Sequence, residues 1–195
     1  MDKFSYAIGM GIAQNLVSMG ASQNIDVDVF AQALKDVFGK EKTQMTFVEA
    51  RDLVNKYFSE MEAKMNAENI AKGKAFLEEN KKREGVVTLP SGLQYEVLKE
   101  GNGKKPTAND RVKCHYEGTL IDGTVFDSSV KRGVPAVFGV SQVIQGWVEA
   151  LQLMNEGSKW RLYIPSELAY GDQQAGELIP PHSTLIFDVE LLQIV

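Results

Sequence analysis

Two neighbouring segments, VKCHYEGTL and VFDSS, bring together residues that could form a binding site for a small ligand. Both alternate apolar and polar residues, and the Asp-Gly pair between them favours a tight reversal between two strands. Because the side chains of a strand alternate between its faces, Tyr116 is expected to point inward. Phe126 and Asp127 follow the reversal and end the second strand. An aromatic ring and a carboxylate beside an inward tyrosine indicate an apolar cleft with a few polar groups.

A purely structural role explains these residues equally well. Tyr116 and Phe126 can belong to an apolar core, and Asp127 can begin an Asp-Ser turn. Later parts of the chain favour the cleft, because an apolar helical patch, the sequence LAYG and a final apolar strand each add an aromatic residue. These residues are Trp147, Tyr170 and Phe187.

Composition excludes several classes of function. The net charge of -5 argues against nucleic-acid binding, which requires a basic surface. One cysteine and two histidines offer no spacing typical of a metal site, and Gly9-Met10-Gly11 lacks the third glycine of a dinucleotide fingerprint. We therefore expect no metal and no cofactor. Motifs typical of hydrolases are also missing, including G-x-S-x-G and H-E-x-x-H.

The compartment follows from the same features. The chain has no apolar run long enough to span a membrane, and its single Cys114 cannot form an internal disulfide bond. Gln14, Asn15 and Ser18 interrupt the first apolar run, so it is expected to form a helix of the mature protein rather than a signal peptide. These features predict a cytoplasmic protein without membrane association, or a periplasmic one if a signal peptide has been removed.

Three helices are predicted in the N-terminal part. The first covers about Lys3 to Ser18 and ends before Gly20. The second begins after Asp26 or Asp28, carries an apolar stripe and ends at Gly39. The third begins with a capping box formed by Thr46 and Glu49, and because no proline or turn cluster precedes Gly85 it is expected to run for about 38 residues.

The polar middle of the third helix, Glu62 to Lys74, is expected to be solvated and to separate two domains, with Gly73 as the site of a bend. Two short helices and the start of a long one hold too few residues to bury their own apolar faces. Gly9 and Gly11 cost about 1 kcal/mol each in helix propensity, which the close approach of another backbone would offset. A second copy of the chain is the simplest partner, so the sequence predicts a homodimer.

The C-terminal part is predicted to be an antiparallel sheet. Gly85 to Gly92 is interpreted as a linker, because Pro90 favours extended chain. A short helix is expected from Trp147 to Met154. The predicted strands are Leu93 to Lys99, Arg111 to Leu120, Val125 to Ser128, Lys159 to Ile164, and Thr184 to Ile194. The predicted fold class is therefore α+β, with an all-α N-terminal region and a long linking helix followed by an antiparallel sheet wrapped on a short helix.

Five motifs in order, HYEG, DGTVFDSS, VIQGW, LAYG and IPPHSTLIFDVELL, resemble the FKBP-type peptidyl-prolyl cis-trans isomerases, over about Ser91 to Val195. The N-terminal layout resembles the dimerising region of the bacterial subgroup similar to the macrophage infectivity potentiator. The expected domains are residues 1–65 for dimerisation, 66–90 for the end of the long helix and the linker, and 91–195 for isomerisation.

The resemblance implies an enzyme that accelerates rotation about X-Pro bonds in proteins and assists their folding. Unfolded or partly folded proline-containing proteins would be its substrates, and the macrolides tacrolimus and rapamycin its inhibitors. It implies catalytic roles for Tyr116, Phe126, Asp127, Trp147, Tyr170 and Phe187. It implies a substrate or inhibitor pocket that also includes Phe138, Val143, Ile144, Arg132, Ala136, Leu178 and Ile179. Ala136 departs from the family, many of whose members have phenylalanine there.

A second hypothesis is a chaperone-like binding protein whose isomerase site no longer turns over. Such a protein would hold unfolded chains without catalysing rotation. The complete set of aromatic residues and Asp127 favours catalysis, and an assay on a short proline peptide separates the two hypotheses.

Overall fold

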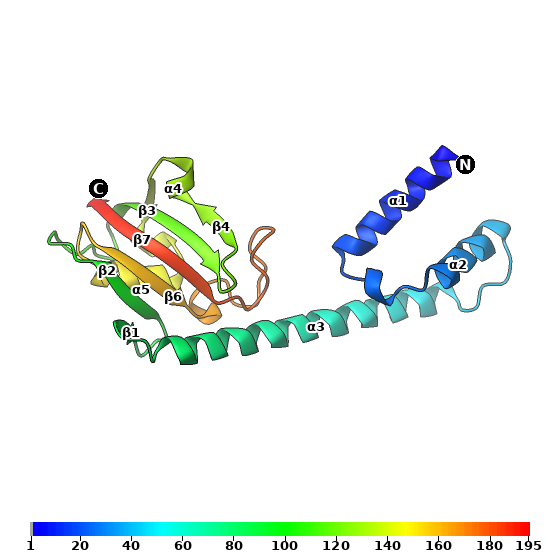
Figure 1. The fold of residues 1–195 in the computed structure, drawn as a ribbon, viewed down its shortest axis with the longest axis horizontal. Coiled ribbons are helices and arrows are strands. Elements are labelled where there is room, and N and C mark those ends of the chain that lie inside the picture. The colour runs from blue at the N-terminus through cyan, green and yellow to red at the C-terminus, as the bar shows by residue number, and fades with distance from the viewer. Residues whose placement is uncertain (1) are drawn as a thin grey trace. The chain divides into compact units, whose positions relative to one another are not determined.

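The computed structural model describes residues 2–195, and the chain divides into two compact units, one ending at Phe58 and one covering Ser59–Val195. The first unit contains α1 (Lys3–Ser18), α2 (Val27–Gly39) and the start of α3 (Phe47–Asn80), with a short 3-10 turn at Ser22–Asn24 (Figure 1). The second unit contains the rest of α3, the sheet and the shorter helices. Within residues 2–195, no helix is both long and apolar enough to cross a lipid bilayer.

Local capping sets the helix boundaries in the first unit. Asp26 accepts hydrogen bonds from the amides of Asp28 and Val29 and so caps α2, which ends at Gly39 as predicted. Thr46 and Glu49 form the predicted capping box, in which the Thr46 amide donates to Glu49 at 2.8 Å and the Glu49 amide donates to Thr46 Oγ1 at 3.2 Å. The predicted bounds of α1 are also confirmed.

The apolar residues of the first unit are largely uncovered. Neither α1 nor α2 contains a buried residue, and the side chains of Phe4, Phe38 and Phe47 are 75%, 81% and 75% exposed. A Cβ atom added at Gly9 or Gly11 would meet nothing within 4 Å. Among the described residues, the first unit by itself supplies neither cover for its apolar stripes nor a close backbone to explain the two glycines.

Helix α3 differs from the sequence prediction in three ways. It runs without a break through Gly73, where a bend was expected, and it ends at Asn80. Gly73 is buried and Asn69 is partly buried, so the polar segment Glu62 to Lys74 is not solvated on every side. These two residues lie four positions apart on one helix face, which packs within the second unit.

The second unit is built on seven antiparallel strands. Their order is β1-β2-β6-β7-β3-β4, and β5 pairs with β3 beside β4. The bounds are β1 Val86–Thr88, β2 Gln94–Lys99, β3 Arg111–Leu120, β4 Val125–Ser128, β5 Ala136–Gly139, β6 Lys159–Ile164 and β7 Leu185–Ile194. The predicted bounds of β3, β4 and β6 are confirmed, and those of β2 and β7 are each one residue too long at the start.

Three short elements differ from the sequence prediction. The expected linker contains β1, which pairs with β2, and two elements after β4 were not predicted, namely α4 (Ser129–Arg132) and β5. Two 3-10 turns, Val140–Gln142 and Ser166–Leu168, complete the unit. Short strands depend on their partners in the sheet more than on local sequence, which explains why they were missed.

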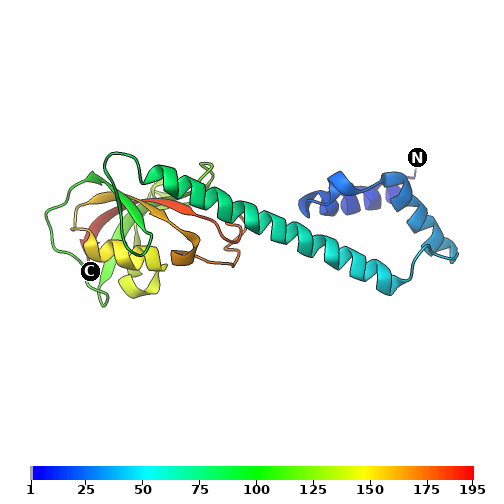
Figure 2. The same cartoon turned by 90° about the horizontal axis from the view of Figure 1, so that it is seen from below.

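The core lies between the sheet and α5 (Gln145–Leu153), whose inward residues are Trp147, Ala150 and Leu151. Figure 2 shows α5 in yellow on one side of the sheet and the C-terminal end of α3 in green on the other. A Cβ atom at Gly146 would lie 2.6 Å from Ile164 Cγ2 of β6, so glycine is needed for α5 to approach the sheet this closely.

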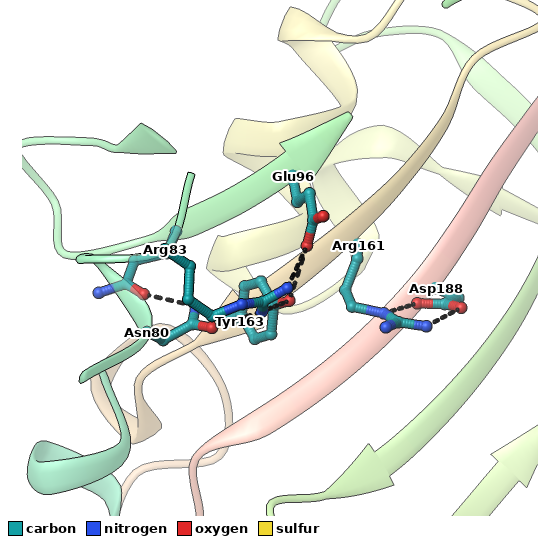
Figure 3. Close-up of polar contacts among 7 residues, drawn as sticks. Asn80, Arg83, Glu96, Arg161, Tyr163 and Asp188 are labelled. Atoms are coloured by element: carbon teal, nitrogen blue, oxygen red, sulfur yellow. Dashed lines mark hydrogen bonds and ion pairs between the residues drawn. The ribbon is translucent and has the colours of Figure 1, made fainter. Parts of the chain in front are cut away.

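Polar contacts join the end of α3 to the outer face of the sheet (Figure 3). The buried Asn80 donates to Gln94 at 2.8 Å, and Gln94 donates in turn to the carbonyl of Leu77 at 2.9 Å. Just after the helix, Arg83 donates to the Tyr163 hydroxyl at 2.7 Å and pairs with Glu96 at 3.1 Å. The last turns of α3 are therefore part of the second unit.

Candidate active site

A cavity of about 810 Å³ opens at one end of the sheet, between β3, β4, α5 and the loop before β7. Its volume lies in the range of small-ligand sites. It contains eleven of the residues predicted for the site: Tyr116, Phe126, Asp127, Phe138, Val143, Ile144, Trp147, Tyr170, Leu178, Ile179 and Phe187.

Two predicted pocket residues lie outside the lining. Ala136 is paired with Cys114 across β5 and β3 and packs against the core, next to the cavity lining rather than in it. Arg132 does not line the cavity either, but it contacts two residues that do. The backbone pairing of β5, which the sequence did not predict, determines where Ala136 lies.

The floor of the cavity is Trp147, which is 3% exposed and surrounded by aromatic edges. Tyr116, Phe138 and Phe187 each meet its ring edge-on, with centroids 5.5, 5.7 and 5.3 Å away. Phe126 meets Phe187 in the same manner at 5.4 Å. Edge-to-face contacts of this kind fix the rings relative to one another, so the apolar surface of the cavity is formed in advance of binding.

Three polar side chains are bonded to one another at the cavity: Tyr116 and Asp127 of its lining, and Arg132 beside them. The Tyr116 hydroxyl donates a hydrogen bond to Asp127. Arg132 forms an ion pair with the same carboxylate and donates to the Tyr116 hydroxyl at 3.0 Å. Its guanidinium also lies over the Tyr116 ring, 5.8 Å from the centroid. Asp127 is held on both oxygens, one by each partner.

These contacts set the charge of the site. Partial burial favours a higher pKa for Asp127, but hydrogen bonds from Tyr116 and Arg132 outweigh it, so the pKa lies below the usual value of 3.8. Burial, and then the hydrogen bond to Asp127, raise the pKa of Tyr116 above its usual value of 10.0. At neutral pH the site therefore holds a carboxylate, a neutral phenol and a guanidinium.

Residues behind the cavity fix the position of Tyr116. The buried Ser129, the first residue of α4, accepts from the Tyr116 amide at 2.7 Å and donates to the Tyr116 carbonyl at 3.2 Å. Its hydroxyl also lies 3.1 Å from His115 Nδ1. Sequence reasoning missed Ser129, because a serine at a strand end carries no signal of a buried role.

Gly118 makes room for the aromatic wall. A Cβ atom there would lie 2.5 Å from Phe126 Cε2 and 2.7 Å from Phe187 Cε1. Both rings lie against the backbone of β3 at this position. Glycine is therefore required for the observed ring positions.

The outer wall is a short loop that the sequence predicted only in part. Ala175 and Ile179 exchange backbone hydrogen bonds of 3.0 and 3.3 Å, which close the loop between them. Gly176 and Glu177 lie in this loop and line the cavity together with Gln142, and none of the three was predicted. Loop residues show no periodicity, so no pattern in the sequence indicated them. Leu178 and Tyr170 form the lip, 49% and 41% exposed.

The first residues of α5 offer a donor to a ligand. Ile144 is the N-cap of α5, and its carbonyl accepts from the amides of Trp147 and Val148 at 2.9 and 3.1 Å. Among residues 2–195, no group accepts a hydrogen bond from the Ile144 amide. An amide at a helix N-terminus that lines a cavity suits a carbonyl group of a ligand.

The arrangement provides binding and electrostatics rather than covalent catalysis. The cavity lining in the described chain contains no serine, cysteine or lysine as a nucleophile and no histidine as a base. Cys114 lies in the core, where burial raises the pKa of its thiol to about 12. The cavity suits a compact apolar group attached to a polar carbonyl.

Comparisons with known proteins agree with this geometry. The family described as FKBP-type peptidyl-prolyl cis-trans isomerase matches residues 102–192, and the domain described as amino-terminal to it matches residues 1–97. The chain is 45% identical to the outer membrane protein MIP of Legionella longbeachae, over 99% of this chain and 85% of that protein. It is 46% identical to the FKBP-type 22 kDa peptidyl-prolyl cis-trans isomerase of Escherichia coli, over 97% and 93% of the two chains. The crystal structure of FkpA from Escherichia coli matches with a TM-score of 0.81 at 35% identity, over 98% of this chain and 95% of that one.

Proposed function

The chain belongs to the FKBP-type peptidyl-prolyl cis-trans isomerase family, and we propose that the cavity floored by Trp147 is where it accelerates rotation about X-Pro bonds. The observation that supports this site is the meeting of an aromatic cavity with a fully bonded Asp127 at its rim. The proline ring of the substrate enters the aromatic part, and the preceding carbonyl faces the polar part.

The chemistry requires no bond to be made or broken. Rotation of a peptide bond must pass a barrier of about 18–20 kcal/mol, because amide resonance is lost when the bond is twisted. A planar amide has more charge separation than a twisted one, so it loses more when water is removed from it. An apolar cavity that excludes water therefore favours the twisted form over both planar forms.

Each polar group of the site has a proposed role. The Ile144 amide holds a substrate carbonyl, and the Tyr170 hydroxyl at the lip offers a second donor. The charge of the Asp127 carboxylate, which lines the cavity, is proposed to favour the twisted amide. Tyr116 and Arg132 keep that carboxylate ionised and in place, as the lowered pKa of Asp127 indicates.

The test uses a protease-coupled assay on a short proline peptide. Asp127→Ala and Phe126→Ala are expected to lower kcat/KM by tenfold or more, since one removes the charge and the other part of the aromatic wall. Asp172→Ala is the matched control, because its carboxylate is exposed and lies outside the cavity lining. Wild-type turnover of both cavity variants would show that the site is assigned wrongly.

The chaperone-like alternative predicts a different outcome. A chain that only binds unfolded proteins would leave the cis-trans relaxation of the peptide unchanged, while still suppressing aggregation of a denatured client. The closed Tyr116–Asp127–Arg132 set favours catalysis, because a site for passive binding has no need of a fixed, ionised carboxylate.

The first unit is proposed to form a homodimer. The support is its exposed aromatic residues and the open space at Gly9 and Gly11, which a second copy of the chain would fill. Light scattering at micromolar concentration is expected to give twice the mass of 21.6 kDa. Gly11→Leu is expected to shift the protein toward monomer, and a wild-type monomer would refute the proposal.

The proposed partners of the cavity are unfolded or partly folded proline-containing proteins and the macrolides tacrolimus and rapamycin. Macrolides should compete with proline peptides, because both would occupy the aromatic cavity. The proposed compartment is the cell envelope rather than the cytoplasm, since a relative that is 45% identical is named an outer membrane protein. Cell fractionation with an antibody against the chain tests the compartment directly.

The domain division is also a proposal. Residues before about 59 serve dimerisation, and the isomerase domain begins within α3. The support is that contacts of Leu77, Asn80 and Arg83 join the end of this helix to the sheet.

A further inference from the structure

We propose that Asn69 and Gly73 of helix α3 are positioning residues for the prolyl cavity, because they hold the loop that forms its outer wall. This inference rests on the proposed function of the cavity. It gives the long helix a part in the isomerase site itself, in addition to its place between the two units.

The first contact is a hydrogen bond from the helix to the base of the loop. Asn69 Nδ2 donates to the carbonyl of Pro181 at 3.1 Å, and both residues are partly buried. Pro181 lies two positions after Ile179, which is 6% exposed and lines the cavity. The intervening residue is Pro180. The fixed φ angles of two consecutive prolines leave this stretch little freedom, so a shift at Pro181 is passed on to Ile179.

The second contact is a close approach that only glycine allows. A Cβ atom at Gly73 would lie less than 3.0 Å from Thr184 Oγ1 and 3.4 Å from Thr184 Cβ. Thr184 is buried and directly precedes β7, which carries Phe187 of the cavity. A larger residue at position 73 must therefore displace the Thr184 side chain, the helix or the start of β7.

The loop is held firmly enough to transmit such a shift. The His182 amide donates to the carbonyl of Gly171 at 2.8 Å, and His182 itself has a φ of 58°, a conformation that residues other than glycine rarely adopt. Ser183 donates to the carbonyl of Pro180 at 2.7 Å. Together with the bonds between Ala175 and Ile179, these contacts make the wall one connected piece.

The helix is fixed at its other end, so it can act as a support. Asn80 and Arg83 bind Gln94, Tyr163 and Glu96 on the outer face of the sheet (Figure 3), and the Phe76 ring lies 6.0 Å from that of Tyr163. The helix contacts Pro181 and Thr184, which follow the wall loop, about two to three turns before Asn80. The position of the wall is thus set against the sheet through α3.

The experiment measures catalysis and ligand binding on the full chain. Gly73→Ala is expected to lower kcat/KM for a short proline peptide by about tenfold, since misplacement of a site by about 1 Å can cost up to about 100-fold. The loss is expected mainly in KM, and tacrolimus affinity should fall by a similar factor, because the wall contacts the ligand while Asp127 is untouched. Asn69→Ala is expected to give a smaller loss of about threefold.

Rescue separates positioning from general damage. Thr184→Ala removes the oxygen that a side chain at position 73 would strike. In the double variant of Gly73→Ala and Thr184→Ala, kcat/KM is expected to return to within about threefold of Thr184→Ala alone, a coupling that a mutant cycle measures. Asn55→Ala is the matched control for Asn69→Ala, because it makes the same change at an exposed position of the same helix.

The outcomes are distinct. Wild-type kcat/KM and tacrolimus affinity in folded Gly73→Ala and Asn69→Ala proteins would overturn the proposal. A loss in Gly73→Ala that Thr184→Ala does not restore, with a parallel fall in melting temperature, would also overturn it. Asp127→Ala measured in parallel tests the site itself. If Asp127→Ala lowers turnover while the helix variants do not, only the role of α3 is wrong.

Discussion

Replacing Gly118 by alanine tests the aromatic wall with a single added methyl group. That methyl group would lie 2.5 Å from the Phe126 ring and 2.7 Å from the Phe187 ring, far inside van der Waals contact. Position 118 faces Asp127 on β4 and Phe187 on β7, so neither neighbouring strand can move without breaking backbone pairs. The rings must therefore shift, and Phe126 has more freedom because it is only partly buried.

The expected cost can be worked out from these contacts. Overpacking of a filled core costs about 1–3 kcal/mol. Against this, removing glycine from the interior of a strand is worth about 0.5–1 kcal/mol. The net loss in the free energy of unfolding is therefore expected to be at most about 2.5 kcal/mol, which leaves the protein folded. The displaced Phe126 ring narrows the cavity, so kcat/KM should fall by about tenfold or more, further than the loss of stability alone explains.

Urea unfolding and the protease-coupled peptide assay measure the two effects on one preparation. Gly39→Ala is the matched control, because a methyl group at this exposed helix end would meet only the Glu41 side chain, at 3.4 Å. In a second background, Phe126→Ala, the clash with the Phe126 ring is removed and only the 2.7 Å approach to Phe187 remains, so Gly118→Ala should lower the free energy of unfolding less strongly. A Gly118→Ala protein with wild-type stability and turnover would refute the packing described for β3, β4 and β7.

Three further predictions follow from the same structure. Trp147→Ala is expected to lower both turnover and the free energy of unfolding, the latter by about 3–5 kcal/mol, because it removes the ring that three other aromatic rings contact. Denaturant unfolding measures the loss of stability, and a loss of turnover without a loss of stability would contradict the prediction. The pH profile of kcat/KM is expected to be flat between about pH 5 and pH 9, because the pKa of Asp127 is lowered from 3.8 and that of Tyr116 is raised from 10.0. The charge of Asp127 is lost only as the pH falls through its lowered pKa. A bell-shaped profile centred near pH 7 would instead indicate proton transfer and contradict this prediction. A fragment covering 59–195 should keep the peptide turnover of the full chain. A fragment covering 85–195 should be less stable than it by about 1–3 kcal/mol, because the buried Gln94 loses its hydrogen bonds with Asn80 and the Leu77 carbonyl. Equal thermal stability of the two fragments would show that α3 does not stabilise this unit.

Local signals in the sequence predicted the elements that carry the site. The alternation in VKCHYEGTL and the Asp-Gly reversal fixed both bounds of β3 and β4, and hence the inward direction of Tyr116. The capping box at Thr46 located the start of α3 in the same way. Such signals are read from neighbouring residues, so no knowledge of the tertiary structure is needed.

The features that were missed depend on contacts between distant parts of the chain. Glycine in a helix predicts a bend when only propensity is considered, but Gly73 is present because Thr184 lies against it, more than 100 residues away. Asn69 lies in a segment whose composition is typical of a solvated helix, and only its contact with Pro181 distinguishes it from its neighbours. Ala136 follows the same pattern, because its position depends on the pairing of β5 with β3.

Exchange spectroscopy by NMR on a short proline peptide tests the central claim most directly, because it measures cis-trans rotation without a coupled protease. We expect the wild-type protein to accelerate the exchange strongly and Asp127→Ala to slow it by tenfold or more. Shifts of the protein amides on peptide binding should concentrate at residues of the cavity lining, including Ile144 and Ile179. Exchange that is as fast with Asp127→Ala as with the wild-type protein, or shifts that concentrate away from this cavity, would contradict the account.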